Sequence, residues 1–292
     1  EGGNLAQDVK AFREALDSPK DSRHLALSQK LHRQLFQPLE ATITKQHVLI
    51  VAHGALHYLP FNALHDGREY VIDRYRLRQL PSASIMPYLR GTRAGKAGTL
   101  LAFGNPDLGD KRYDLAHAQT EAQAITRVVP GARALVRKEA TETAFKQQGG
   151  NYAYVHFASH GEFNADSPLN SALLLARDKT NDGVLTVGEL YSMRLNADLV
   201  TLSACETGLG KIANGDDVVG LTRGFLYAGS RSIVASLWKV DDEATAYLMT
   251  RFYGALKGTS KREALRLAQI ETRKKYSHPY YWAAFQLTGE AN

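Results

Sequence analysis

The sequence is poor in cysteine, in methionine and in long apolar runs. It holds one cysteine, Cys205, in 292 residues, so it can form neither an intrachain disulfide nor a cysteine-rich zinc site. No apolar stretch approaches the length that crosses a bilayer, and the polar opening carries no secretory signal. We therefore expect a cytoplasmic protein that does not engage a membrane. Because an initiator methionine is also lacking, we expect the chain to be part of a longer one.

The charge is mildly basic and evenly spread. The net charge is +6 and the isoelectric point about 9.2, but lysines and arginines are interspersed with acids throughout. The densest basic stretch, 261–275, spaces its apolar residues at roughly helical intervals, which is typical of a helix with a solvated face. A protein that binds nucleic acid would favour a basic stripe or a known motif, and the sequence has neither. Direct binding of nucleic acid is therefore not expected.

Apolar runs alternate with segments of helical periodicity. The runs are nearly continuous in apolar residues, as strands are when helices cover both faces of a sheet. We predict strands at 47–52, 99–104, 152–158, 171–176, 198–204, 232–238 and 283–289. We predict helices at 25–43, 116–129, 141–148, 186–193, 218–229 and 241–258. This alternation predicts the α/β fold class, with a mostly parallel sheet sandwiched by helices.

A polar, glycine-rich stretch at 91–98 precedes a fresh strand and indicates a boundary. We therefore divide the chain into a smaller half, residues 1–97, and a larger domain, residues 98–292.

Cys205 stands where an apolar strand runs into a glycine-rich loop, in "LVTLSACETGLG". Ligands of open α/β sheets bind at the carboxyl ends of strands, so this position suits a nucleophile. A lone cysteine is also commonly a small buried apolar residue. The position alone leaves both interpretations open.

His160 occupies the matching position after another apolar strand, in "YVHFASHGEF", 45 residues before Cys205. If both strands lie in one parallel sheet, the two side chains meet at the same edge, where the imidazole can lower the pKa of the thiol. The N–H groups of Gly161 and Cys205 are then placed to form an oxyanion hole. This dyad needs no cofactor and no metal. The spacing resembles that of caspases, although the caspase sequence around the cysteine is missing.

Three other motifs predict neither a metal site nor a phosphate site. His156 lies inside its strand, where a histidine is usually a packed core residue. The histidines of "HGALH" (53–57) have helical spacing but no glutamate between them, so they do not predict a zinc helix. The loop "GLGKIANG" (208–215) fails the phosphate-binding pattern, because Cys205 occupies its first glycine position and Ile212 follows the lysine.

The chain resembles the CHAT family, a branch of the caspase-like clan that also contains separases and caspases. The resemblance rests on "HFASHGEF", "LVTLSACETGLG" and "GDDVVGLTRGFLYAGSRSIVASLWKVDDEAT", together with "LFQPLE", "LHYLPFNAL" and "LRQLPSASIM", and it spans roughly 25–290. It implies a caspase-like core, cysteine endopeptidase activity on a protein or peptide, and a catalytic dyad at His160 and Cys205. It also implies that the first half is a non-catalytic copy of the core, where His53 replaces an acid common in relatives.

The resemblance further implies a regulatory partner or upstream helical repeats of the tetratricopeptide (TPR) type. Cleavage after a basic residue would need carboxylates in the substrate pocket. The candidates are Asp216, Asp217, Asp241 and Asp242. Each of them also suits a second role, the capping of a helix N-terminus.

Three alternatives stay open from the sequence. The first is a non-catalytic scaffolding or interaction module with a latent dyad. The second is a thiol hydrolase that acts on small amides. The third is a proenzyme-like switch that waits for a partner.

Overall fold

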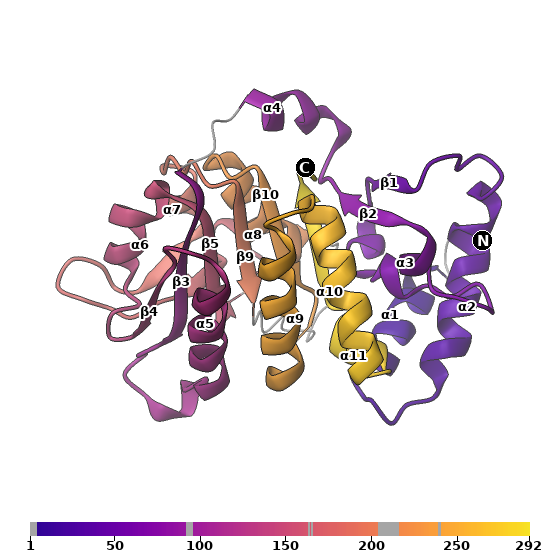
Figure 1. Ribbon diagram of the computed structural model, residues 1–292, viewed down its shortest axis with the longest axis horizontal. Helices are drawn as coiled ribbons and strands as arrows, with labels where there is room; N and C mark the ends of the chain where they lie inside the picture. The colour runs from indigo at the N-terminus through magenta and orange to yellow at the C-terminus, as the bar shows by residue number, and fades with distance from the viewer. Residues whose placement is uncertain (1–4, 92–95, 163, 165, 204–215, 239–240) are drawn as a thin grey trace.

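The centre of the molecule is an eight-stranded, mostly parallel sheet (Figure 1). The computed structural model describes residues 5–91, 96–162, 164, 166–203, 216–238 and 241–292. In spatial order the strands are β1 (His47–Ile50), β2 (Arg76–Gln79), β11 (Phe285–Gly289), β10 (Ser232–Ser236), β9 (Leu199–Ser203), β5 (Tyr152–Ala158), β3 (Lys96–Pro106) and β4 (Arg133–Arg137). Each of these neighbouring pairs is parallel except β10–β11.

Helices cover both faces of the sheet. Leu100 and Ala102 of β3 belong to one core, whereas Leu101 and Phe103 belong to the other, because successive side chains of a strand point to opposite faces. The first core is closed by α5 (Ala116–Val128), α9 (Asp242–Ala255) and α10 (Lys261–Lys275), and the second by α6 (Glu142–Gln148), α7 (Val187–Leu190) and α8 (Asp216–Tyr227). The predicted layered α/β fold is confirmed, and the double burial explains why the central strands are apolar throughout.

Side-chain caps fix where several helices begin. Thr141 accepts a hydrogen bond from the Ala144 N–H at 3.0 Å, as its position before α6 predicted. The predicted helix at 25–43 is shorter, because Pro38 interrupts it: α2 (Arg23–Leu35) is followed by the 3-10 turn Gln37–Leu39. The other short helices are α3 (Val71–Arg74), α4 (Met86–Gly91) and α11 (Pro279–Trp282), with 3-10 turns at Gly54–Tyr58, Phe61–Ala63, Ala83–Ile85, Lys111–Tyr113, Gly149–Asn151 and Pro168–Asn170.

The first ninety residues extend the same sheet. Gln79 of β2 pairs with Thr288 of β11, so β1 and β2 add to the edge next to the last strand of the chain. The boundary expected at 97/98 falls within β3. The division into a smaller half and a catalytic domain remains a prediction.

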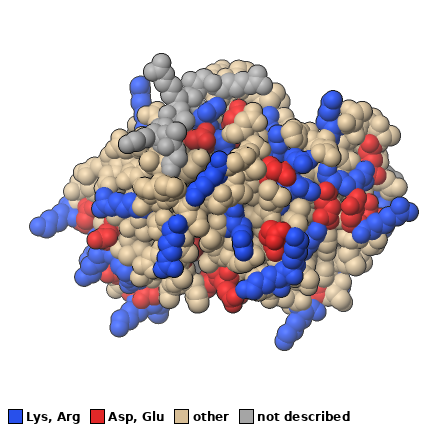
Figure 2. All heavy atoms as spheres, in the orientation of Figure 1, with Lys and Arg blue, Asp and Glu red and all other residues tan. Residues whose placement is uncertain are grey.

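The surface matches the even charge pattern of the sequence. On the face shown in Figure 2, basic and acidic side chains are interspersed over the described residues rather than gathered by sign. None of the helices in the described part of the chain combines the length and apolar character that crossing a bilayer requires.

Helix α1 (Leu5–Leu16) inserts a charged side chain into the main core. Arg13 is fully buried, and its Nη2 donates to the Leu237 carbonyl oxygen at 2.9 Å while the guanidinium lies 4.2 Å over the Trp238 ring. Burial lowers the pKa of Arg13 to about 10, with Asp17 and Tyr58 acting in the opposite direction. Within the described residues its Nε and Nη1 have no hydrogen-bond partner. The helix is thus anchored to the end of β10.

Phe12→Ala should show that α1 is an integral part of the core. Phe12 is fully buried, so we expect a loss of about 3–5 kcal/mol in the free energy of unfolding, measured by urea titration. Lys10→Ala on the exposed side of the same helix is the control, with an expected change within about 0.5 kcal/mol. Equal effects of the two substitutions would contradict a packed α1.

Candidate active site

The register between β5 and β9 aligns the two predicted site segments. Ala158, the last residue of β5, pairs with Ser203, the last residue of β9, in a parallel ladder. His160 follows Ala158 by two positions, as Cys205 follows Ser203 in the sequence. The two adjacent strands therefore end side by side at the same sheet edge. Cys205 itself lies outside the described residues.

The imidazole of His160 is oriented by a backbone carbonyl. His160 Nε2 lies 2.9 Å from the carbonyl oxygen of Tyr113, and the two rings meet edge to face with 5.8 Å between centroids. A carbonyl only accepts, so Nε2 must carry the proton, and the neutral ring has its lone pair on Nδ1. This tautomer presents a proton acceptor on the side opposite Tyr113.

A small antiparallel sheet holds the backbone after His160. It contains β6 (Gly161–Glu162), β7 (Ala172–Leu174) and β8 (Val184–Thr186). The Leu174 N–H donates to the His160 carbonyl oxygen at 2.9 Å. In antiparallel pairing the next pair, Gly161 and Leu173, is then a non-hydrogen-bonded one, so β7 does not take up the Gly161 N–H.

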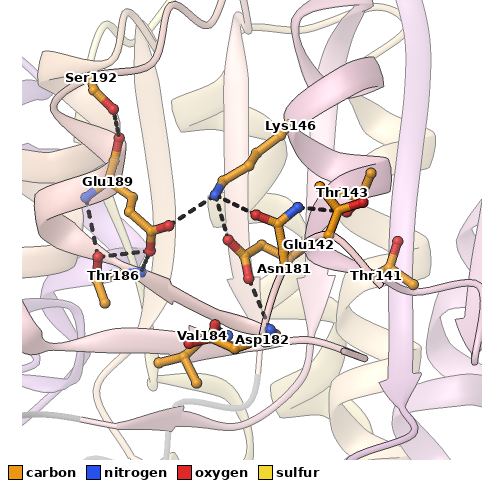
Figure 3. Close-up of polar contacts among 12 residues, drawn as sticks. Thr141, Glu142, Thr143, Lys146, Asn181, Asp182, Val184, Thr186, Glu189 and Ser192 are labelled. Carbon is orange, nitrogen blue, oxygen red and sulfur yellow. Dashed lines mark hydrogen bonds and ion pairs between the residues drawn. The ribbon is translucent and has the colours of Figure 1, made fainter. Parts of the chain in front are cut away.

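A polar cluster fastens this small sheet to α6 and α7 (Figure 3). Lys146 Nζ lies 2.5 Å from Glu142 Oε1, 2.8 Å from Glu189 Oε1 and 3.0 Å from Asn181 Oδ1. Glu142 is fully buried, and its other oxygen accepts from the Gly183 N–H at 2.9 Å. Gly183 has φ +89°, and a Cβ there would lie 2.4 Å from a neighbouring carbonyl oxygen, so the turn requires glycine.

Glu189 also closes the start of α7. It forms a capping box with Thr186, whose side chain accepts from the Glu189 N–H at 3.1 Å. Burial would raise the pKa of Glu189, but hydrogen bonds from Lys146 and Thr186 outweigh it and lower the pKa from 4.5 to about 2. The ionised carboxylate is therefore favoured by folding.

Glu189→Gln should destabilise the protein in a pH-dependent way. The folded pKa lies below the ordinary value, so the wild-type advantage is complete above about pH 4.5 and disappears as the pH falls toward 2. Urea midpoints of wild type and variant should converge between pH 6 and about pH 3. In a Lys146→Met background the pH dependence should shrink. A difference that stays constant over this range would contradict the assignment.

The acids predicted to bind substrate fall into two groups. Asp216 and Asp217 open α8, and their side chains lie outside the described residues. Asp241 caps α9 by accepting from the Ala244 N–H at 2.9 Å. Asp242 is exposed and lies 3.9 Å from the ring of His117. Capping at Asp241 is confirmed, whereas a substrate-binding role for any of the four stays a prediction.

His156 is the core residue that its position indicated. It is fully buried, with Nδ1 3.2 Å from the Tyr253 hydroxyl and Nε2 3.1 Å from Glu121 Oε1. The Tyr253 hydroxyl in turn donates to Thr201, so the network joins β5 and β9 to α5 and α9. Among the described residues no group of three or more His, Cys, Asp or Glu is arranged to hold a metal ion.

Sequence reasoning missed the residues that support His160. Tyr113 contacts His160 through its backbone oxygen, and since every residue has one, the sequence does not indicate this role. Its loop is recognisable only as turn-forming composition, "GNPDLGD" at 104–110. Glu142 and Lys146 are four residues apart on a short helix, a spacing that is typical of an ordinary ion pair on a helix surface.

The sheet order, the helices on both faces and the adjacent ends of β5 and β9 define a caspase-like α/β fold. The model of the CHAT domain family matches residues 25–290. The chain therefore belongs to the CHAT domain family.

Two curated relatives share this region. Tetratricopeptide repeat protein 28 of Homo sapiens is 25% identical over 294 residues, and its Mus musculus counterpart is 26% identical over 296. Each alignment covers 83% of this chain but only 12% of the relative. The chain thus spans a small part of these proteins.

Two solved structures share the fold at low identity. Separase from Saccharomyces cerevisiae, in complex with securin, has a TM-score of 0.58 at 14% identity, covering 91% of this chain and 17% of that one. The Arg specific cysteine proteinase gingipain R has a TM-score of 0.55 at 10% identity, covering 99% and 74%. At these identities the likeness shows the fold alone.

Proposed function

We propose that this chain is a cysteine endopeptidase of the CHAT type, with Cys205 as nucleophile and His160 as general base. The observation that supports it best is that β5 and β9 end side by side, with Ala158 paired to Ser203. The hydrogen bond between His160 Nε2 and the Tyr113 carbonyl oxygen supports it further. In the neutral imidazole that bond keeps the proton on Nε2, so that Nδ1 can accept the thiol proton. The caspase-like fold supports the same reaction class.

In the proposed reaction His160 Nδ1 takes the Cys205 proton, and the thiolate attacks the carbonyl carbon of the scissile peptide bond. The N–H groups of Gly161 and Cys205 stabilise the oxyanion. As the intermediate collapses, the C–N bond breaks, and His160 gives its proton to the leaving amine. His160 then deprotonates a water molecule, which hydrolyses the thioester and frees Cys205.

A peptide-directed probe tests the dyad directly, because the chain has one cysteine. We expect a peptidyl acyloxymethyl ketone to add one adduct to the intact mass, and none with Cys205→Ala. His160→Ala should slow labelling at least ~100-fold, the usual contribution of a general base.

His47→Ala, which removes an exposed histidine of β1 at the far edge of the sheet, serves as the matched control and should label at the wild-type rate. If no peptide probe reacts while iodoacetamide still alkylates Cys205, the proposal fails and a scaffolding module with a latent dyad replaces it.

We further propose cleavage after a basic residue. Gingipain R is an Arg specific proteinase, and four acids of this chain adjoin the carboxyl edge of the sheet in sequence. Asp241→Asn is a clean test of one of them, because asparagine caps a helix as well as aspartate does but carries no charge.

Probes with Arg, Leu or Asp next to the reactive group should rank Arg first, and Asp241→Asn or Asp242→Asn should lower the Arg preference alone. The same loss for all three probes would indicate misfolding rather than specificity. An Arg preference unchanged in both variants and in Asp216→Asn and Asp217→Asn would contradict a role for these acids.

We also propose that helical repeats or a partner regulate the site. The relatives are tetratricopeptide repeat proteins of which this chain spans 12%.

A further inference from the structure

Two residues with side chains adopt backbone conformations that usually require glycine. In the described part of the chain, Asn105 (φ 49°) and Arg137 (φ 52°) are the non-glycine residues in the left-handed region. They lie at the carboxyl ends of neighbouring strands, where the β3–β4 register shifts between Gly104 and Pro106 and Pro106 pairs with Arg137. A residue keeps an unfavourable backbone conformation only where surrounding contacts hold it, and residues of this kind cluster at functional sites.

The contacts of both residues converge on one loop, residues 107–115. Asn105 is 4% exposed, and its Oδ1 accepts from the Leu115 N–H at 2.7 Å. Arg137 Nη1 donates to Asp114 Oδ1 at 2.6 Å, and the Arg137 carbonyl oxygen accepts from the Asp107 N–H at 3.2 Å. The loop is therefore held at its first residue and at its last two.

This loop carries the carbonyl that orients the candidate catalytic histidine. Tyr113 directly precedes Asp114, and its carbonyl oxygen lies 2.9 Å from His160 Nε2. Within the loop, Lys111–Tyr113 form a 3-10 turn, and the Tyr113 N–H donates to the Asp110 carbonyl oxygen at 3.1 Å. These contacts shape the turn itself, whereas the bonds from Asn105 and Arg137 tie it to the sheet. The position of the Tyr113 carbonyl oxygen depends on the anchors at Asp114 and Leu115.

We propose that Asn105 is a positioning residue for His160, with Arg137 as the second anchor of the same loop. Together they place the Tyr113 carbonyl so that the neutral imidazole keeps its proton on Nε2 and its lone pair on Nδ1. The consequence for catalysis rests on the proposed function, whereas the tautomer of His160 does not.

Three substitutions at residue 105 separate positioning from simple turn formation. Asn105→Gly tolerates the left-handed φ but removes the buried acceptor. Asn105→Asp keeps the acceptor in a residue that also visits this region. Asn105→Ala removes the acceptor and adds strain. Arg133→Gln is the control, because Arg133 opens the same strand as Arg137 and its side chain donates to Gln148 on the exposed surface, away from the loop.

The first readout is independent of activity. Long-range ¹⁵N–¹H NMR of the imidazole nitrogens reports the tautomer of each histidine, and His160→Ala identifies the signals of His160 among the ten histidines. Wild type, Asn105→Asp and Arg133→Gln should show the Nε2–H form. Asn105→Gly should show a mixture of both tautomers.

The second readout is the labelling rate of Cys205. A peptidyl acyloxymethyl ketone should react about ten-fold or more slowly with Asn105→Gly, because a wrong tautomer is costly to a general base, and Asn105→Asp should restore the rate. Alkylation by iodoacetamide of the reduced protein at pH 9, where the thiolate forms without a base, should change less than two-fold.

A wild-type tautomer and a wild-type labelling rate in folded Asn105→Gly would overturn the proposal. If Asn105→Gly fails to fold, Asp114→Asn decides instead, because it weakens the exposed anchor to Arg137 and should shift the tautomer in the same direction. An unchanged tautomer in Asp114→Asn would then overturn it. If the tautomer shifts as expected but wild type labels with no peptide probe, the positioning role stands and the endopeptidase proposal falls.

Discussion

The parallel register between β5 and β9 is the constraint on which the rest of the site depends. With Ala158 opposite Ser203, the two strands end next to each other at one edge of the sheet. A slip of one position would turn every side chain of a strand to the opposite face, exchanging Val155 and Phe157 with His156. The two cores and the buried network around His156 therefore specify the register. The same packing that stabilises the sheet thus sets where β5 and β9 end.

Support for His160 comes from both sides of that edge. The loop after β3 fixes the imidazole through the Tyr113 carbonyl, and β7 fixes the peptide backbone through the His160 carbonyl. In a catalytic triad a carboxylate would bind the imidazole, whereas both of these contacts are made by backbone groups. Backbone partners cannot be protonated at working pH, so neither of these two direct contacts of His160 titrates.

The sequence predicted those parts whose pattern reflects burial. The strand at 152–158 and the helix at 116–129 were predicted almost residue for residue, because burial on two faces, or on one helical face, leaves a periodic apolar pattern. Strands β2, "RLRQ", and β4, "RALVR", escaped prediction because arginines interrupt the apolar residues. Helix α1 was not predicted, although Leu5, Val9, Phe12 and Leu16 recur in it at helical spacing.

The site shows the same division. His160 was found because an imidazole after a strand is a recognisable pattern, and the structure supplies the orienting partner that the sequence left open. That partner is a carbonyl oxygen, and its placement depends on side-chain contacts such as Asn105 to Leu115 and Arg137 to Asp114. Such contacts follow from how the loop after β3 folds back on the sheet, and no apolar periodicity of the sequence encodes them.

The buried guanidinium of α1 has a consequence for how the protein folds. Arg13 and Leu237 are 224 positions apart, and α1 lies outside the segment that the CHAT family model matches. A contact of such long range closes a large loop, which is entropically costly and slows folding. During synthesis α1 is made before β10, and it can pack on α2 early, because Lys30 of α2 lies 2.7 Å from Asp8 of α1. The Arg13 guanidinium, however, meets its carbonyl only after β10 has been made, so this part of the core closes late.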